Sequence, residues 1–281
     1  MKIELILATL AENDQDLIRL NSSIRPSTAT VDLIVINQSQ KKLSNIFKIN
    51  NLSKIIIKNI NLKGLSHARN IGLEFSSGDI VAFPDDDCYY DVNTLDQVNN
   101  FFERNSSVDV LIGRQVDPSN GLSPKMQTES QFNVGESDLS YVGNSICIFV
   151  RKNAITSAHR FEENLGAGRY FGSHEERDYL ADLLNNGAKI FYDGKIVIFH
   201  KVYAFDEWST SKAISYARGM GAYFSKHHGV SCLSAYWLIL RPFIGALISA
   251  ILFDRHSFKY RTVRIYGNII GFFKFKKTDK K

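Results

Sequence analysis

Short apolar runs alternate with helix-like segments along the first ninety residues, and this alternation constrains the fold more than any other feature. Four such runs lie in the segments 3–9, 31–37, 54–60 and 79–85. Continuous apolar runs of this length are typical of strands buried on both faces, and helices between them are typical of parallel connections. The pattern therefore predicts an α/β fold, with a Rossmann-like, mainly parallel central sheet flanked by helices.

The middle of the chain extends the pattern less regularly, with a loop-rich stretch at 117–140 and a glycine-rich stretch at 161–173. The segment 188–202 predicts a hairpin or a pair of strands, with Asp193 and Gly194 as the turn. Helices are expected at 94–107, 174–187 and 206–227, and strands at 108–116 and, leading into a helix, at 141–155.

The composition is that of an ordinary globular protein. Hydrophobic residues make up 44% and charged residues 22% of 281 residues, enough for one large core or two modest ones. The three cysteines are widely spaced and odd in number, which fits a reducing compartment and no disulfide framework or zinc pattern. The N-terminal run is interrupted by Glu4 and lacks the marks of a signal peptide, so the body of the protein is expected in the cytosol.

The C-terminal part differs from the body in charge and hydropathy. Residues 226–281 carry a net charge of +9, whereas the preceding residues carry −4. The apolar segment 232–253 is nearly long enough to span a bilayer, but Arg241 and Pro242 stand at its middle. This pattern fits two short helices that enter the membrane interface better than one membrane-spanning helix. The basic residues would then contact anionic lipids. A buried helical hairpin with a solvated basic end is the alternative, and the apolar residues argue against nucleic acid as a partner.

Three consecutive aspartates, Asp85, Asp86 and Asp87, directly follow an apolar run and a proline. Because like charges this close repel one another, a compensating positive charge is expected. Carboxylates suit Mg2+ or Mn2+, which usually bind through one or two carboxylates together with substrate phosphates. The position after a buried strand favours a metal–diphosphate site over a turn whose aspartates cap the next helix.

Other polar residues also follow predicted strands. Thr9 ends the first strand, and Asn37–Ser39 ends the second. Ligands of parallel α/β sheets bind beyond the carboxyl ends of the strands, at a switch point in strand order. These residues and the aspartates are therefore expected to converge on one crevice. His200 also ends an apolar strand, where a structural histidine is the simpler interpretation unless that strand runs towards the aspartates.

A second acidic group, Glu175, Glu176 and Asp178, opens a predicted helix behind the glycine-rich stretch. Acids in a first helical turn are favoured by the helix dipole, so a structural role explains any one of them. A glycine-rich, aromatic loop before the acids also suits a pocket with a general base. A partly desolvated carboxylate there would have a raised pKa and could take a proton from a hydroxyl group.

Five segments carry a family resemblance: LILATL, DLIVINQS, GLSHARNIGLEFSSGDIVAFPDDD, GAGRYFGSHEERDYL and IVIFH. In this order and spacing they resemble a family 2 glycosyltransferase of the GT-A fold, in particular the bacterial members that build capsular, exopolysaccharide or O-antigen chains. The most specific part is G-x-x-x-A-R-N-x-G, followed by a strand and the aspartates. The resemblance implies a catalytic domain at 1–225, with nucleotide-sugar binding at about 1–115 and acceptor binding and catalysis at about 116–225. Residues 226–281 would form a helical, membrane-associating extension.

On the donor side, the resemblance implies a nucleotide-sugar site. Gln38 stands where the family usually has an Asp that reads the uracil ring, so the base stays open, although a Gln amide can accept from N3–H and donate to O4. Arg69 would lie near the phosphates, and Asp85 would face the ribose or donor sugar. The residues implied in nucleotide-sugar binding are Thr9, Gln38, Gly64, Arg69, Asn70, Asp85 and Asp86.

The resemblance also implies a divalent metal, Mn2+ or Mg2+, as a Lewis acid on the departing diphosphate. Asp87, Asp85 and His200 match its ligands. Glu176 matches the catalytic base, where the family more commonly has an Asp. Glu175 matches the acidic residue before it. Residues proposed to shape the acceptor site are Tyr170, His174 and Asp178.

The expected activity is inverting transfer of a hexosyl-type sugar from a nucleotide-diphosphate sugar, expected to be a UDP-sugar. The acceptor would be a hydroxyl of a glycan or lipid-linked glycan in bacterial surface polysaccharide synthesis. The expected location is cytoplasmic and peripheral, at the cytoplasmic face of the cell membrane, with 226–281 on the anionic surface. One alternative is a catalytically inactive GT-A-like scaffold of a membrane polysaccharide assembly. The other is a GT-A-like nucleotidyltransferase, against which the acids of GSHEERD and the lack of a glycine-rich phosphate loop after the first strand argue.

Overall fold

The computed structural model describes most of the chain. Two segments for which the sequence predicts structure are not among the described residues. Residues 206–208, at the start of a predicted helix, and 279–281, at the end of the predicted extension, lie outside the described residues. The described ranges are 1–48, 51–124, 127–156, 159–202 and 209–278, with side chains up to residue 275.

The chain forms two compact units, each described here by itself. The first comprises Met1–Arg160 and Tyr179–Val202, and the second comprises Phe161–Asp178 and Tyr203–Lys281. The glycine-rich loop thus belongs to the same compact unit as the C-terminal helices rather than to the unit of the sheet.

The first unit is built on a nine-stranded sheet. Its strands are β1 (Lys2–Thr9), β2 (Thr30–Asn37), β3 (Lys54–Asn59), β4 (Ile80–Ala82), β5 (Tyr89–Tyr90), β6 (Val110–Val116), β7 (Gln131–Asn133), β8 (Ile148–Arg151) and β9 (Ile190–Phe199). The order is β3-β2-β1-β4-β8-β6-β9-β5, with β7 paired to β9. Strands β3, β2, β1 and β4 run parallel, β8 is antiparallel to both neighbours, and β6 and β9 are again parallel. The α/β fold with a central sheet is confirmed, and the parallel order holds through its N-terminal half.

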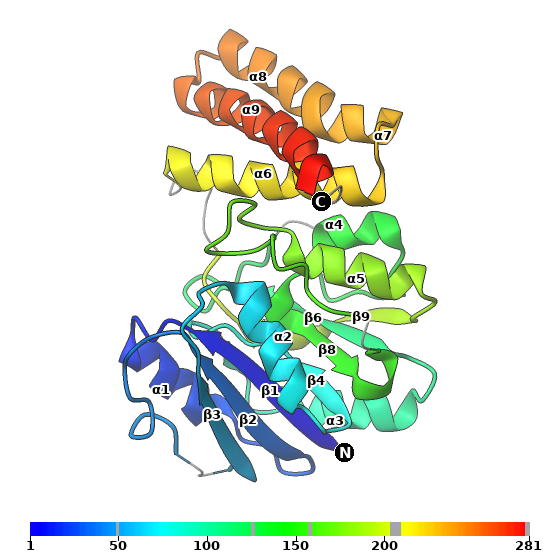
Figure 1. The fold of residues 1–281 in the computed structure, drawn as a ribbon. Helices are drawn as coiled ribbons and strands as arrows, with labels where there is room; N and C mark the ends of the chain where they lie inside the picture. Colours follow the sequence, from blue (N-terminus) through cyan, green and yellow to red (C-terminus); the bar gives the residue numbers. More distant parts are fainter. Residues whose placement is uncertain (49–50, 125–126, 157–158, 203–208, 279–281) are drawn as a thin grey trace. The chain divides into compact units, whose positions relative to one another are not determined.

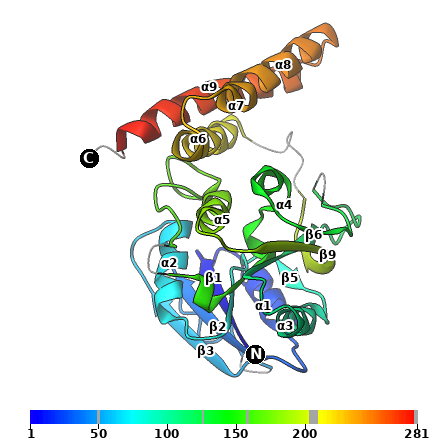
Figure 2. The ribbon, with the colours of Figure 1, turned by 90° about the vertical axis from the view of Figure 1, so that its right-hand side faces the viewer.

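Helices cover both faces of this sheet. They are α1 (Asp14–Ser23), α2 (Leu65–Phe75), α3 (Thr94–Arg104) and the short α4 (Leu139–Val142), and the 3-10 turns are Glu136–Asp138, Ser145–Cys147 and Lys152–Ala154. Figure 2 shows α2 on one side of the sheet and α1 and α3 on the other. Every residue from Ile3 to Thr9 and from Val31 to Asn37 is buried. The two central strands are therefore covered on both faces, as their unbroken apolar runs require.

The segment predicted as a hairpin is one continuous strand. Asp193 and Gly194 lie inside β9, so the prediction of a turn there is wrong. A Cβ atom built on Gly194 would lie only 1.8 Å from the carbonyl oxygen of Thr128. This glycine marks a close approach of two backbones, which uses the same residue type as a tight turn and leaves the same signal in the sequence.

Asp96, in the first turn of α3, ties this helix to the segment between α1 and β2. Its carboxylate accepts hydrogen bonds of 2.7–3.0 Å from the backbone and hydroxyl groups of Ser27 and Thr28. Burial opposes ionisation of this carboxyl, but the hydrogen bonds outweigh burial and lower the pKa of Asp96 to about 2.

Asp96 should therefore make unfolding of the first unit pH-dependent. Because its folded pKa lies below the ordinary value of 3.8, its contribution is complete above about pH 4 and is lost as the pH falls towards 2. Asp96→Asn should flatten the fall in melting temperature between pH 4 and 2. Thermal unfolding followed by circular dichroism measures this, with the exposed Glu12→Gln as control. Identical pH profiles for wild type and Asp96→Asn would contradict the assignment.

The second unit is a helical layer. Its helices are α6 (Thr210–His227), α7 (Cys232–Ala235), α8 (Arg241–Ile251) and α9 (Arg255–Thr278), and the first turn of α5 (Glu175–Asn185) also belongs to it. In Figure 1, α9 lies between α6 and α8 and packs along both. Glycines let α6 and α9 approach closely, since a Cβ atom on Gly271 would lie 2.1 Å from the carbonyl oxygen of Arg218. Leu165 and Phe171 of the glycine-rich loop pack with Ala222 of α6 and Phe275 of α9.

Pro242 does not break the helix, contrary to the expectation of two short helices. A π-helical turn, Tyr236–Leu240, joins α7 to α8, so the helix continues from Cys232 to Ile251. Proline has no N–H, which leaves the carbonyl of Leu238, four residues earlier, without its α-helical donor. The buried side chain of Asn268, on α9, donates to that carbonyl at 2.9 Å. The neighbouring helix thus replaces the donor that the proline removes.

The Asn268–Leu238 contact can be tested by a double-mutant cycle. Asn268→Ala should lower the free energy of unfolding by about 1–3 kcal/mol, because it leaves a buried carbonyl without a donor. Pro242→Ala restores a backbone N–H, so the cost of Asn268→Ala should fall by roughly 1 kcal/mol in that background. Chemical denaturation of the four proteins measures both values. An equal cost in both backgrounds would mean that Asn268 acts through packing alone.

Candidate functional site

Three strand ends of the first unit meet at the aspartates. Thr9 ends β1, and its hydroxyl donates to Oδ2 of Asp86 at 2.6 Å and accepts from the backbone N–H of Ala11 at 2.8 Å. Asn37 ends β2, where its side chain donates to Asn59 at the end of β3. The structure thus brings the carboxyl ends of neighbouring parallel strands together, at the edge where the sheet order predicts a ligand.

Gln38 links the end of β2 to the start of α2. Its side-chain oxygen accepts from the backbone N–H of Gly64 at 2.7 Å, and the residue is buried. Gly64 caps α2 with a φ of 146°, a left-handed conformation that favours glycine. The hydrogen bond leaves the Gln38 amide NH2 and one oxygen lone pair for another partner.

Arg69 supplies the positive charge that the three aspartates require. Its side chain is fully buried on α2, and it donates to Oδ1 of Asp85 and to the hydroxyl of Ser145, both at 2.9 Å. Asn70, the next residue on α2, is also buried. The helix that begins at Gly64 therefore places a guanidinium group against the first aspartate.

His200 supplies a second compensating group, next to Asp87. Its Nε2 lies 3.1 Å from Oδ1 of Asp87. Burial lowers the pKa of His200, but the carboxylate of Asp87 outweighs burial and raises it. Burial raises the pKa of Asp87, and the His200 contact outweighs it and lowers that pKa. Asp86 differs, because burial dominates and raises its pKa despite the Thr9 hydrogen bond. The contact with His200 thus favours the ionised form of Asp87, whereas burial favours the protonated form of Asp86.

The orientation of the His200 ring is set from behind by Gln115. The Gln115 amide donates to the backbone oxygens of His200 and Lys201, at 3.2 and 3.1 Å. Nδ1 of His200 lies 2.6 Å from the same Lys201 oxygen and 3.0 Å from the Gln115 amide nitrogen, and Nε2 is directed at Asp87. The sequence analysis did not single out Gln115, although a polar side chain in the buried part of β6 was the available signal.

This donor set fits a divalent cation. An imidazole nitrogen and a carboxylate oxygen face one another, and the other ring nitrogen lies beside a backbone carbonyl, as in many protein metal sites. Asp85 keeps its second oxygen, since Arg69 engages Oδ1. The residues that could hold Mn2+ or Mg2+ are therefore those predicted: Asp85, Asp87 and His200.

The candidate base lies in the second unit. Glu175 is buried and Glu176 is half-buried in the first turn of α5. His174, just before them, has a φ of 71°, a strained value for a residue with a side chain. Its Nδ1 lies 2.7 Å from the Ser173 hydroxyl, and its Nε2 accepts from Arg177 at 3.1 Å. Burial and the nearby arginines lower the pKa of His174 well below its ordinary value, so a neutral histidine holds the start of this helix.

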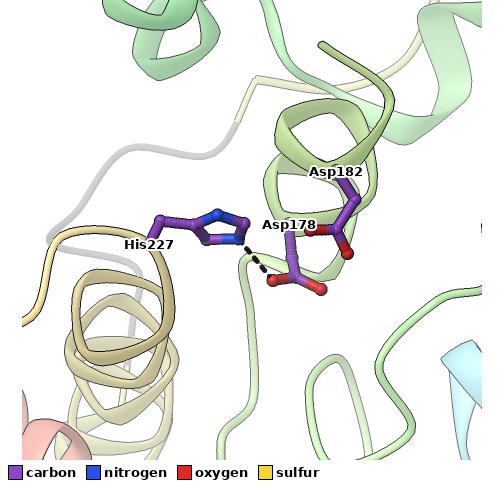
Figure 3. Close-up of side chains that lie close together, drawn as sticks. All are labelled: Asp178, Asp182 and His227. Carbon is purple, nitrogen blue, oxygen red and sulfur yellow. Dashed lines mark hydrogen bonds and ion pairs between the residues drawn. The ribbon is translucent and has the colours of Figure 1, made fainter. Parts of the chain in front are cut away.

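The other two acceptor-site candidates lie in different surroundings. Tyr170 is 42% exposed, with the cations of Arg218 and Lys274 at 4.2 and 4.8 Å from its ring centroid. Asp178 is fully buried and accepts from Lys226 at 2.9 Å and from His227 at 2.8 Å (Figure 3). Exposure keeps Tyr170 a candidate for stacking on a sugar, whereas burial favours a structural role for Asp178.

Asp178 and Asp182, one turn apart on α5, offer oxygen atoms that also resemble a metal site (Figure 3). Lys226 already neutralises Asp178, and a cation there would have to displace a buried ammonium group. We therefore assign Asp178 to an ion pair that ties α5 to the end of α6.

Comparison with known proteins supports the resemblance seen in the sequence. Residues 30–163 match the family described as Glycosyl transferase family 2. This range contains Gln38, Gly64, Arg69, Asn70 and the three aspartates. No curated protein matches the chain.

Several solved structures resemble this chain in fold. The chain resembles S. aureus TarS at 17% identity and a TM-score of 0.60, covering 94% of this chain and 55% of TarS, so it spans about half the length of that protein. For TarS 1–349 with UDP-GlcNAc, identity is 17%, the TM-score is 0.58 and the coverage is 99% and 92%. The mannosyltransferase PcManGT from Pyrobaculum calidifontis, solved with GDP-Man and Mn2+, is 12% identical to the chain, with a TM-score of 0.69. The match covers 97% of this chain and 87% of PcManGT. The fold is therefore the GT-A fold of glycosyltransferases, and the chain is similar to family 2 over residues 30–163.

The Thr9 hydroxyl should stabilise the aspartate cluster measurably. Thr9→Val removes the donor to Asp86 and the acceptor for the Ala11 N–H, so the free energy of unfolding should fall by about 1–3 kcal/mol. Thr9→Ser keeps the hydroxyl and should recover most of that loss. Denaturant unfolding of the three proteins measures it. Equal stabilities of Thr9→Val and Thr9→Ser would show that the hydrogen bonds contribute little.

Proposed function

We propose that this protein is a metal-dependent, inverting glycosyltransferase. It transfers a hexosyl-type sugar from a nucleotide-diphosphate sugar to a hydroxyl of a glycan or lipid-linked glycan. The observation that carries the proposal is the convergence of Asp85, Asp87, Arg69 and His200 at the carboxyl end of β4. The family match and the GT-A fold support the same activity.

A UDP-sugar is the donor that we favour. The neighbours with this fold bind UDP and UDP-GlcNAc in one case and GDP-Man with Mn2+ in another, so the fold accepts more than one base. Gln38 stands where family members carry an Asp, and its remaining donor and acceptor groups suit the O4 and N3–H of uracil. Thr9 and Asp86 line the same strand ends and are assigned to the nucleoside side of the site.

The residues near the aspartates would bind the diphosphate. A divalent metal held by Asp85, Asp87 and His200 would supply Lewis-acid stabilisation of the departing diphosphate. Arg69 holds Asp85 in place and adds positive charge on the same side. Gln115 keeps Nε2 of His200 directed at Asp87, so the ligand set is arranged before binding.

Glu176 is assigned as the general base. It takes the proton from the acceptor hydroxyl, whose oxygen attacks the anomeric carbon from the face opposite the diphosphate, so the configuration inverts. Glu175 precedes it, and the hydrogen-bonded His174 fixes the backbone where α5 begins. Tyr170 is assigned to stacking on the acceptor sugar.

Within the cell, we place the reaction in bacterial surface polysaccharide synthesis, at the cytoplasmic face of the membrane. The basic, apolar residues of 226–278 support this location. A scaffold subunit without catalysis is the competing function, and nucleotide binding with turnover separates the two.

Donor binding and turnover test the proposal directly. Melting temperatures are measured with UDP, GDP, CDP and dTDP, each with and without Mn2+. A nucleotide at about 100 times its dissociation constant should stabilise the fold by roughly 2.7 kcal/mol. We expect UDP to do so only with Mn2+, and Asp87→Asn to abolish the effect while Asp91→Asn retains it.

Turnover is then measured as release of UDP from UDP-sugars. Glu176→Gln should lower the rate by about 100-fold or more without changing the UDP-dependent melting shift, and the exposed Glu163→Gln should not lower it. Nucleotide binding without turnover in any variant, wild type included, would favour the scaffold. Absence of any nucleotide-dependent shift in folded protein would contradict both the metal site and the transferase.

A further inference from the structure

Four arginines gather within the second unit, beside an exposed apolar helix face. We propose that Arg177, Arg241, Arg261 and Arg264 bind the phosphate group of an anionic membrane lipid, whose apolar chains contact the exposed face of α8. The four side chains come from α5, α8 and α9, and we call them the arginine cluster.

The register between α8 and α9 places three of them together. The side chain of Asn268 contacts the carbonyl of Leu238, and the guanidinium group of Arg261 lies against Gly245, where an added Cβ would be 1.9 Å from its nitrogen. From Leu238 to Gly245 the first helix advances by seven residues, while from Asn268 to Arg261 the second goes back by seven, so the two helices run antiparallel. By this register Arg241 lies opposite residue 265, adjacent to Arg264. Arg241 also stacks on Trp237, with its guanidinium carbon 4.8 Å from the ring centroid.

Helix α6 connects the fourth arginine to this group. Arg264 donates to the sulfur of Met220 at 3.2 Å. One turn further along α6, the Tyr223 ring lies 5.9 Å from the ring of His174, and His174 accepts from Arg177. Arg264 therefore contacts α6 at Met220, and Arg177 lies near α6 one turn further along, at Tyr223.

The cluster has a large excess of positive charge. Residues 209–278 contain eleven lysines and arginines and one acid, Asp254. That carboxylate accepts from the backbone of Ser257 at the start of α9. Within the described part of the chain, no ion pair joins Arg241, Arg261 or Arg264 to a carboxylate. Burial lowers the pKa of Arg264, and the positive charges of Arg241, Arg177 and Arg261 lower it further. Tyr260 acts in the opposite direction and raises it, but by less. The guanidinium groups of Arg241, Arg261 and Arg264 thus lie together without a carboxylate partner in the described part of the chain, which suits a phosphate that several guanidinium groups can bind at once.

An apolar stripe runs along the helix beside the cluster. Tyr236, Leu240, Phe243, Leu247 and Ile251 recur at three- and four-residue spacing, so they share one face, and all are exposed. Phe253, just past the end of α8, is 91% exposed and has a φ of 54°. A continuous exposed stripe of this kind marks an interaction surface rather than an ordinary soluble face.

The chemistry of the two features together selects a lipid. Nucleic acid would meet the arginines but not the stripe, and an apolar protein surface would meet the stripe but leave the arginines without anions. An interfacial helix with apolar residues on one face and basic residues beside them matches the boundary between acyl chains and phosphates. Trp237, stacked under Arg241, is of the residue type favoured at that boundary. By length and composition the helix Cys232–Ile251 could also cross a membrane, but α9 packs along it and donates to its backbone. We therefore place it along the surface of the membrane.

The inference deepens the proposed function on the acceptor side and rests on it there. Arg177 directly follows the assigned base Glu176 on α5. A lipid phosphate in the arginine cluster would therefore bring a lipid-linked acceptor to the helix that carries the base. Lipid binding itself needs no donor and no turnover, so its failure and the failure of sugar transfer are measured separately.

Vesicle flotation of the full chain tests the inference. The vesicles are phosphatidylcholine alone or with 20 mol% phosphatidylglycerol, about 100 mM salt being used to limit long-range attraction. Wild type should bind the phosphatidylglycerol vesicles at least about tenfold more tightly than phosphatidylcholine alone. Arg261→Gln/Arg264→Gln should lose at least about tenfold in affinity, whereas the matched pair Arg255→Gln/Lys259→Gln, on the same helix, should lose distinctly less. Ile251→Ser/Phe253→Ser should weaken binding to both kinds of vesicle, with Leu62→Ser/Val92→Ser as control.

The outcomes separate a site from a diffuse charge effect. Equal losses in the two double charge variants would overturn the arginine cluster as a binding site, because simple attraction depends on charge number alone. Equal affinity of wild type for vesicles with and without phosphatidylglycerol would overturn the assignment of a lipid phosphate as the ligand. If inorganic phosphate without added metal raised the melting temperature of wild type but not of Arg261→Gln/Arg264→Gln, while vesicles did not bind, the ligand would be a soluble phosphate and the lipid assignment would be wrong. If the Arg261/Arg264 variant does not fold, the exposed Arg241→Gln replaces it in the same comparison.

Discussion

Charge compensation at the end of β4 is the constraint on which the donor site depends. Three adjacent carboxylates are tolerable only because a buried guanidinium holds Asp85 and an imidazole meets Asp87, while burial raises the pKa of Asp86. Each compensating group comes from a distant part of the chain, and each needs its own support. Arg69 depends on the helix that Gly64 starts, and His200 depends on Gln115. The sheet order is what brings these supports to a single edge.

Local pattern was sufficient for the features that follow from backbone periodicity. The buried runs of β1 and β2 correctly predicted covered strands, and the glycine stop at Gly187 correctly predicted the end of α5. The aspartates were located because like charges after an apolar strand are costly unless compensated. That argument called for a positive partner, and the family motif placed Arg69 near the donor phosphates, but nothing local pairs Arg69 with Asp85, which lies sixteen positions further along the chain.

Features that depend on contacts between distant segments could not be predicted in this way. Gly194 lies in a strand because the backbone near Thr128 approaches it, and an Asp-Gly pair looks the same in a turn. Pro242 is accommodated because Asn268 replaces the missing donor. Asp178 can be buried because Lys226 neutralises it and His227 forms a hydrogen bond with it. In each case the deciding partner lies more than twenty-five residues away and belongs to another element.

The chain enters the second unit twice, at 161–178 and again after residue 202. Leu165 and Phe171 belong to the first of these segments, yet one of the side chains that pack on them, Phe275, lies more than one hundred residues further along the chain. The loop that leads to Glu176 therefore cannot complete its packing before Phe275 has been synthesised. Until then, a nascent chain could complete the sheet of the first unit while this loop still lacked one of its packing partners. Fragments cut after the sheet domain would lose the partners of that loop, so neither half of such a cut is a natural folding unit.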